Sequence, residues 1–179
     1  MSSFTSPRAG IVCLDLQRNR QAGEGAAPGL EPTLDMCRRV LGEARRRRWP
    51  VLHVHSRHAA PVDERPISGL EPRPSEPVFV RQGPSAFSSP GFARAAAALG
   101  GPLALIGFSL HDTVLATAFA AADRHLDVDV LSNAVWGGSE PVDDALLAPL
   151  RALAPQARVV EVADLFRDDQ GAFAAANLP

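Results

Sequence analysis

Residues 103–135 read LALIGFSLHDTVLATAFAAADRHLDVDVLSNAV and contain the unit that decides the fold. An apolar run at 103–108 comes first, a segment whose apolar residues recur at spacings of three and four follows at 114–125, and a second apolar run closes the stretch at 128–135. A helix is the usual connection between parallel strands, because a tight turn cannot join them. The stretch therefore predicts a parallel β-sheet covered by helices.

The same alternation of strand and helix continues along the chain. Four further apolar runs predict strands: GIVCLDL (10–16), VLHVHS (51–56), VFVRQ (78–82) and RVVEVADL (158–165). Segments of helical spacing lie at 34–48, 92–100 and 143–153. Residues 56–77 contain five prolines and no period, so we expect a long loop there, of a kind that often carries function.

These elements predict the fold class. Six nearly continuous apolar strands that alternate with helices indicate a three-layer, doubly wound α/β fold with a mostly parallel, Rossmann-like sheet. The chain has 179 residues, of which 46% are hydrophobic, so we expect a single domain over residues 1–179. The run Arg45 to Arg48 closes the first long helix and suits its dipole; we expect a solvated helix end rather than a binding patch.

Composition limits the kinds of partner and of chemistry. The formal net charge is −2, so nothing favours a nucleic acid or an anionic membrane over a small metabolite. All eighteen Lys and Arg residues are arginine, which excludes Schiff-base chemistry on a lysine of this chain. Its two cysteines, Cys13 and Cys37, suggest neither a disulfide framework nor a zinc site. The sequence has no apolar signal core and no run long enough to span a membrane, so we expect a cytoplasmic protein. We expect no cofactor.

Polar residues that follow the predicted strands are the first candidates for a site, because doubly wound sheets bind ligands beyond the carboxyl ends of their strands. Asp15 follows Leu14 near the end of the run at 10–16, where burial favours a general acid or base, although a capping role is the alternative. Arg81 follows Val80 in the run at 78–82 and could hold Asp15 ionised, bind a substrate carboxylate, or simply lie at the surface.

The turn after Gly107 is the third candidate. Free backbone N–H groups at the start of the following helix could stabilise an anion or an oxyanion. Taken alone, Ser109, Asp112 and Thr113 are more readily explained as capping residues of that helix.

Taken together, the three segments resemble the isochorismatase-like cysteine hydrolases. IVCLDLQ resembles the opening strand of that family, VFVRQGPSAF its lysine-bearing segment, and IGFSLHDTVLATAFAAADRHLDVDVLSNAV the turn, helix and strand that hold its nucleophile. The likeness runs in order over residues 9–165. It implies a Rossmann-like sheet, a catalytic trio of aspartate, lysine and cysteine, hydrolysis of a vinyl ether or of an amide or other C–N bond, and a homo-oligomer, either dimer or tetramer.

The departures from the family pattern bear on the mechanism. Asp15 matches the aspartate, whereas Arg81 stands at the lysine position and keeps the charge without being able to donate a proton. Thr113 stands at the cysteine position, and its hydroxyl cannot supply a ready nucleophilic anion. We therefore expect Asp15, Arg81 and Thr113 to form the catalytic group.

Further expectations follow from the same resemblance. Leu110 and Asn133 replace a threonine and an aspartate that are common in the family, and the family tends to have a cis peptide at the position of the Ser109–Leu110 bond. The residues expected to bind substrate are Gln17, Ser85, Phe87, Ser109, Leu110, His111 and Trp136.

A cluster of histidines could also bind a metal. His53, His55 and His58 lie near Asp63, and alternation along a strand puts His53 and His55 on one face. The order differs from that of metal-binding relatives, so we expect ordinary strand-end histidines and no metal.

The sequence leaves three functional interpretations open. The first is a hydrolase that acts on a small, carboxylated metabolite by acid–base catalysis at Asp15 without a cysteine nucleophile. The second is a catalytically degenerate relative that binds a small ligand or a protein partner without turnover. A third, weaker interpretation makes Thr113 a nucleophile activated by Asp15.

Overall fold

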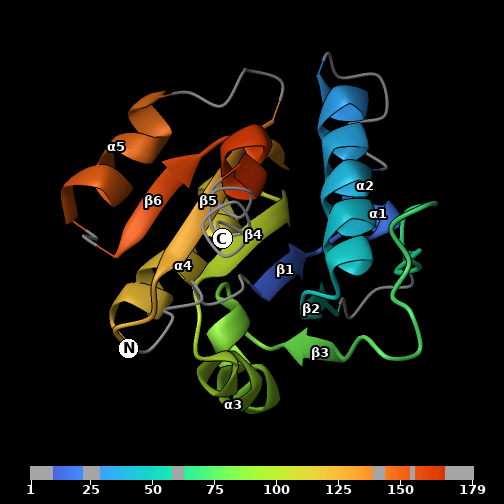
Figure 1. Cartoon of the computed structure of the whole chain (residues 1–179), viewed down its shortest axis with the longest axis horizontal. Coiled ribbons are helices and arrows are strands. Elements are labelled where there is room, and N and C mark those ends of the chain that lie inside the picture. Colours follow the sequence, from blue (N-terminus) through green and yellow to red (C-terminus); the bar gives the residue numbers. More distant parts are fainter. Residues whose placement is uncertain (1–9, 22–28, 58–62, 139–143, 154–155, 168–179) are drawn as a thin grey trace, which may run out of the picture.

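The computed structural model describes residues 10–21, 29–57, 63–138, 144–153 and 156–167 (Figure 1). Six strands form one sheet in the order β3-β2-β1-β4-β5-β6, and every neighbouring pair is parallel. The strands are β1 (Gly10–Leu14), β2 (Val51–Ser56), β3 (Val78–Arg81), β4 (Leu103–Phe108), β5 (Val128–Trp136) and β6 (Ala157–Val160). The order reverses between β1 and β4, so the carboxyl ends of these two strands are the switch point where such sheets bind ligands.

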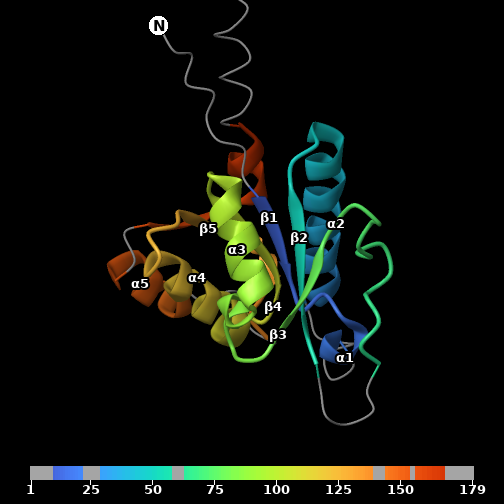
Figure 2. The same ribbon diagram turned by 90° about the horizontal axis from the view of Figure 1, so that it is seen from below.

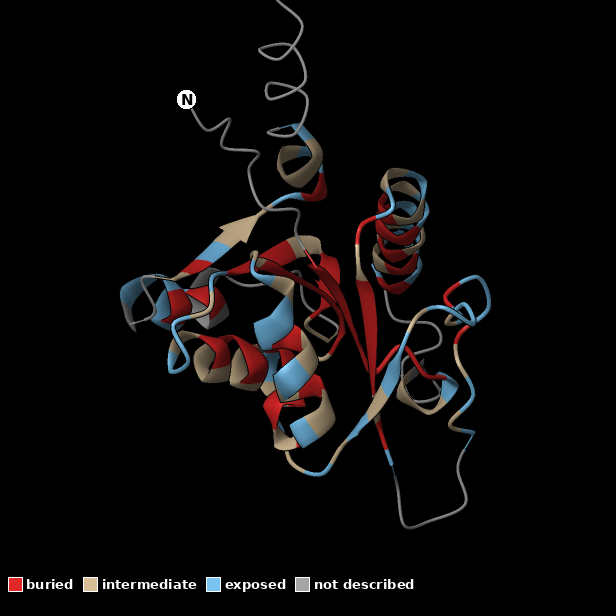
Figure 3. Cartoon of the chain, turned by 60° about the horizontal axis from the view of Figure 1, so that its bottom comes forward, coloured by how far each residue is buried: buried red, intermediate tan, exposed pale blue. Residues whose placement is uncertain are grey.

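Helices cover both faces of the sheet, as predicted. On one side lies α2 (Leu30–Arg47), and on the other lie α3 (Pro90–Leu99), α4 (Leu115–Ala122) and α5 (Asp144–Leu153) (Figure 2). Buried apolar side chains form two separate groups, one between the sheet and α2 and the other between the sheet and the helices of the opposite face. β1 and β4 are buried along their whole length (Figure 3), which explains why both appear in the sequence as unbroken apolar runs. No helix in the described ranges is long and apolar enough to span a membrane.

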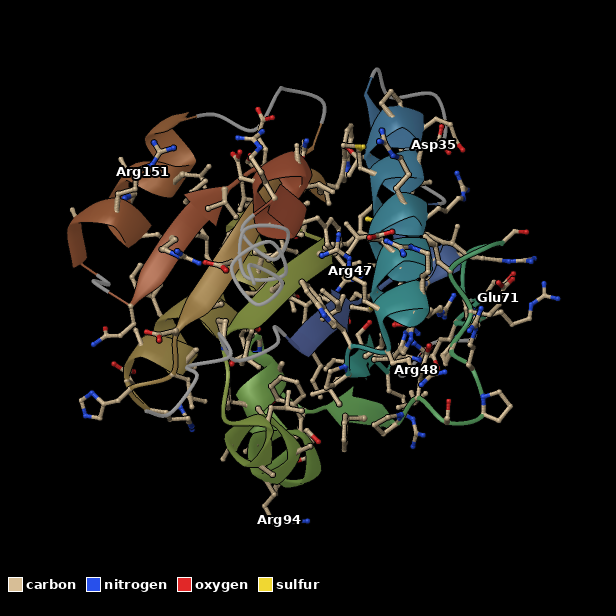
Figure 4. The ribbon with its side chains drawn as sticks, in the orientation of Figure 1. Asp35, Arg47, Arg48, Glu71, Arg94 and Arg151 are labelled. Carbon is tan, nitrogen blue, oxygen red and sulfur yellow. The ribbon has the colours of Figure 1, made fainter. Side chains whose placement is uncertain are left out.

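The longest helix, α2, begins earlier than its spacing predicts. It starts at Leu30 rather than at residue 34, because Pro32 lies in the first turn, where a proline removes no helical hydrogen bond. The arginine run at its end is only partly solvated. Arg45 pairs with Glu76 at 2.7 Å, and Arg47, labelled in Figure 4, pairs with Glu43 and has its guanidinium 4.9 Å from the ring centre of Phe166.

The prediction of a strand over residues 158–165 is wrong beyond Val160. Residues 162–167 are helical instead, and the side chain of Asn133 accepts a hydrogen bond from Val162 N at 3.1 Å, which takes this amide out of the strand ladder. Val162 is buried against the core on the α2 side, and Leu165 and Phe166 pack on the same core. Leu165 and Phe166 follow Val162 by three and four residues, which is the spacing of one helix face. The same short segment is also compatible with the pattern of a strand.

The long connection between β2 and β3 contains no helix or extended strand in its described parts, residue 57 and residues 63–77. Its one strand-like contact is an antiparallel bridge between Gln17 and Pro66. The predicted loop therefore takes the place of a crossover helix and runs beside the carboxyl end of β1.

Candidate active site

The turn at the end of β1 places Asp15 at the switch point. Its backbone N–H still donates to Val54 O of β2 at 2.9 Å, but its φ of 48° is left-handed, a conformation that Asp tolerates better than most residues. The chain therefore leaves the sheet at this residue. The side chain of Asp15 is 0% exposed, so its carboxylate depends on protein groups for its hydrogen bonds.

Arg81 reaches this carboxylate from the end of the edge strand β3. Its Nη2 donates to Asp15 Oδ2 at 2.7 Å, its Nε lies 3.2 Å from both Oδ1 and Oδ2, and its Nη1 donates to Gly83 O at 2.6 Å. The side chain of Arg81 is 11% exposed. A charge-assisted bond of this length in a buried position is among the stronger polar contacts in proteins.

A second guanidinium meets the same carboxylate, and the sequence analysis missed it. Arg20 lies on α1 (Arg18–Gln21), and its Nη2 donates to Asp15 Oδ2 at 2.7 Å with the side chain 23% exposed. A helix of one turn is too short to show a period, and the only signal is a basic residue five positions after a candidate aspartate.

Thr113 comes to Asp15 from the turn after β4. Residues Leu110–Val114 form a π-helical turn in which Val114 N donates to Ser109 O at 3.0 Å, five residues back. Such wide turns are rare and are frequent at functional sites. Thr113 is fully buried, and its hydroxyl donates to Asp15 Oδ2 at 3.3 Å. The structure thus brings together Asp15, Arg81 and Thr113, as the sequence predicts.

Gly107 allows the two central strands to approach at this end. It lies in register with Leu14, and its φ of 113° suits glycine. A Cβ at this position would lie 2.1 Å from Leu14 O, far inside any real contact. A side chain here would therefore push apart the strand ends that carry Asp15 and the turn with Thr113.

Two backbone amides open the turn beside this cluster. Leu110 and His111 are the first two residues of the turn, so no earlier C=O group of the turn can accept from their N–H groups. Neither N–H group donates to another described residue. Asp112 N and Val114 N both donate to Ser109 O, at 3.3 and 3.0 Å. The described backbone has no cis peptide, so the Ser109–Leu110 bond is trans and departs here from the family tendency.

Two of the residues expected to bind substrate use their polar atoms within the protein. Gln17 Nε2 donates to Ser56 O at 3.2 Å and to Glu64 O at 3.0 Å, while its Oε1 accepts from Ser56 N at 2.9 Å. Ser85 caps the 3₁₀ turn Ala86–Ser88 (η1), where its hydroxyl accepts from Phe87 N at 3.1 Å. Gln17 therefore ties the long loop to the end of β1.

The other five differ in burial. Phe87, Leu110 and Trp136 are buried, Ser109 is half-buried, and His111 is exposed. Leu110 and Phe87 belong to the core on the α3 side, whereas Trp136 packs in the core on the α2 side. Among the described residues, no side-chain hydrogen bond joins any of the seven to the carboxylate of Asp15.

Two of the three predicted histidines lie together, since the ring centroids of His53 and His55 are 6.3 Å apart. His53 is buried, and its Nε2 lies 3.0 Å from Oε2 of Glu76, while burial lowers the pKa of His53. Burial alone would raise the pKa of Glu76, but hydrogen bonds from Arg45, Arg73 N and His53 outweigh it and lower that pKa to about 2. His58 lies outside the described residues, and within them no three potential ligands group around a metal position.

Comparisons with known proteins agree with this architecture. The model of the Isochorismatase domain family matches residues 9–164. An isochorismatase from Pseudomonas putida is similar in structure with a TM-score of 0.76 and 22% identity, over 88% of this chain and 90% of that one. A cysteine hydrolase from Pseudomonas syringae gives 0.81 and 13%, over 96% and 97%.

A third solved structure, N-carbamoylsarcosine amidase from Thermoplasma acidophilum, is similar with a TM-score of 0.73 and 21% identity, over 86% of this chain and 96% of that one. No curated protein sequence matches the chain. At identities this low the solved structures establish a shared fold, and the family match spans the strands and turns that carry Asp15, Arg81 and Thr113.

Proposed function

Since the chain belongs to the isochorismatase family of hydrolases, we propose that it hydrolyses a small, carboxylated metabolite by acid–base catalysis at Asp15, without a cysteine nucleophile. The observation that carries the proposal is a fully buried carboxylate at the switch point of the sheet, held by Arg81 and in contact with the Thr113 hydroxyl.

The states of the two cysteines support a mechanism without a thiolate. Burial raises the pKa of Cys37 to about 12 and that of Cys13 well above its ordinary value. Both thiols are buried, and Cys37 Sγ donates to Ala134 O at 3.1 Å. A nucleophilic cysteine needs a lowered pKa and access to substrate, and these two have neither.

The two oxygens of Asp15 have different surroundings. Oδ2 accepts from Arg20, Arg81 and Thr113, whereas Oδ1, among the described residues, receives only the longer contact from Arg81 Nε at 3.2 Å. Oδ1 therefore keeps most of its capacity to accept a further hydrogen bond, such as one from a water molecule. We assign it the role of general base.

The remaining groups suit the other needs of a hydrolysis. For an amide, Asp15 Oδ1 takes a proton from water while the water oxygen forms a bond to the carbonyl carbon; the C–N bond then breaks, and the proton moves from Asp15 to the leaving nitrogen. For a vinyl ether, Asp15 would first give a proton to the terminal alkene carbon and then take one from the water that adds to the resulting cation, and the hemiketal formed would break down to a carbonyl product and an alcohol. The N–H groups of Leu110 and His111 would stabilise charge that develops on a substrate oxygen, and Arg81 would hold the Asp15 carboxylate in place.

The test is hydrolysis of a panel of carboxylated amides and vinyl ethers by the unmodified protein and by Asp15→Asn. We expect saturable turnover of at least one compound, reduced at least ~100-fold in Asp15→Asn, because a positioned acid–base group contributes that much. Full activity of Asp15→Asn would eliminate the assignment.

The alternative function, ligand binding without turnover, has one observation in its favour: the carboxylate of Asp15 is already engaged by two guanidinium groups. Binding of panel compounds with no turnover of any would favour this alternative. Recovery of amidase activity in Thr113→Cys would then indicate loss of a cysteine mechanism.

A further inference from the structure

The cluster at Asp15 contains more positive than negative charge. One carboxylate meets two guanidinium groups, and the side chains of Asp15, Arg81 and Arg20 are 0%, 11% and 23% exposed. A buried carboxylate needs one counterion, and a second leaves a positive charge in a place with little water. Such a charge favours the approach of another anion.

The two arginines differ in how completely they are used. Arg81 places Nε and Nη2 on Asp15 and Nη1 on Gly83 O, so each of its nitrogens has a partner. Arg20 donates to Asp15 through Nη2 alone, and its Nε is buried without an acceptor among the described residues. A buried N–H without a partner is uncommon and costs stability, so it needs a reason.

A neighbouring carboxylate, Asp63, does not satisfy Arg20. Asp63 lies against the same one-turn helix, since Asn19 N donates to Asp63 O at 2.9 Å. The Asp63 side chain instead pairs with Arg65 at 2.7 Å and with Arg18 at 3.9 Å. Asn19, the preceding residue of α1, also has a buried side-chain oxygen without a partner among the described residues, but that oxygen is an acceptor, so the N–H donor that remains unused on α1 is Arg20 Nε.

We propose that Arg20 is the specificity-determining residue that binds the anionic group of the substrate, while Arg81 is retained by Asp15. This inference rests on the proposed function, because it assigns the substrate's charge to the same site. The planar guanidinium suits a carboxylate, and its position on Asp15 Oδ2 brings the bound anion beside the general base. The site would therefore prefer an anionic substrate over a neutral one of the same shape.

The experiment measures binding, so it does not depend on turnover. Trifluoroacetate and trifluoroacetamide are small probes of nearly equal shape that differ in charge, and ¹⁹F NMR titration detects weak binding of either. We expect the unmodified protein to bind trifluoroacetate at least ~10-fold more tightly than the amide, and Arg20→Gln to remove that preference. Asp15→Asn should bind the anion more tightly, since it removes the carboxylate that competes for Arg20.

Arg18→Gln is the matched control, because Arg18 lies two residues away on α1 with its side chain 43% exposed. This variant should keep the preference. If Arg20→Gln does not fold, Arg20→Lys keeps the charge and should retain a reduced preference. Equal binding of the two probes by the unmodified protein, or a preference that persists in Arg20→Gln, would overturn the inference. An anion preference without any turnover would instead leave the inference standing and contradict the proposed hydrolysis.

Discussion

Replacing Gly107 by alanine tests how the fold holds the site together. The new Cβ would lie 2.1 Å from Leu14 O, so β1 and β4 must separate by about 1 Å to reach a tolerable contact. The φ of 113° adds a cost of about 1–2 kcal/mol for any residue with a side chain. Strand hydrogen bonds at this end, worth about 1 kcal/mol each, would weaken as well. We expect a loss of at least about 4 kcal/mol, a large part of the stability of a typical domain.

Equilibrium unfolding in urea measures this loss, and Gly100→Ala is the control. Gly100 also has a positive φ, of 67°, but a Cβ there would meet no atom within 4 Å. Gly100→Ala should therefore lose only the backbone cost of about 1–2 kcal/mol. Equal losses in the two variants would refute the claim that the close approach of β1 and β4 depends on Gly107.

Three further variants test the surroundings of the site. Gln17→Leu removes the side-chain hydrogen bonds of Gln17 to Ser56 and Glu64 while the backbone contacts with the loop remain, so urea unfolding should show a loss of about 2 kcal/mol; an unchanged midpoint would contradict the structural role of the Gln17 side chain. Glu76 has a pKa of about 2 in the folded chain, below its ordinary value, so its contribution is present above about pH 4.5 and is lost as the pH falls toward 2. Unfolding free energy measured across that range should therefore decline less steeply in Glu76→Gln than in the unmodified protein, and parallel curves would argue against the ion pair. Thr113→Val removes a hydroxyl whose hydrogen bond to Asp15 is 3.3 Å long, so kcat/KM should fall less than about 10-fold. Complete loss of activity in this variant, together with an ester trapped on Thr113 of the unmodified protein, would instead identify a nucleophile.

The fold could be predicted because its four central strands, β2, β1, β4 and β5, are largely buried. β2 and β4 begin and end at the residues where their apolar runs do, and β1 begins with its run at Gly10. The strand end at Leu14 could not be predicted, because Leu16 continues the apolar pattern after the left-handed turn at Asp15. The helix at residues 162–167 was missed because the short apolar pattern of Val159, Val160 and Val162 is compatible both with a strand and with the start of a helix.

The site was predictable where it depends on the parallel sheet. The carboxyl ends of parallel strands lie along one edge, which is why Asp15, Arg81 and the turn with Thr113 meet. Arg20 could not be found in the same way, because it lies on a single helical turn between two runs and its position depends on local backbone geometry. The catalytic roles of Asp15, Arg81 and Thr113, and the substrate contacts expected of residues such as Trp136, stay predictions.

The most direct test of the proposed mechanism compares a chain without cysteine to a chain without the Asp15 carboxylate. For the best substrate of the panel, kcat/KM should stay within about 2-fold of the unmodified value in Cys13→Ala/Cys37→Ala, and should fall at least ~100-fold when Asp15→Asn is added. Loss of activity in the folded cysteine-free chain, with activity kept in Asp15→Asn, would contradict acid–base hydrolysis at Asp15.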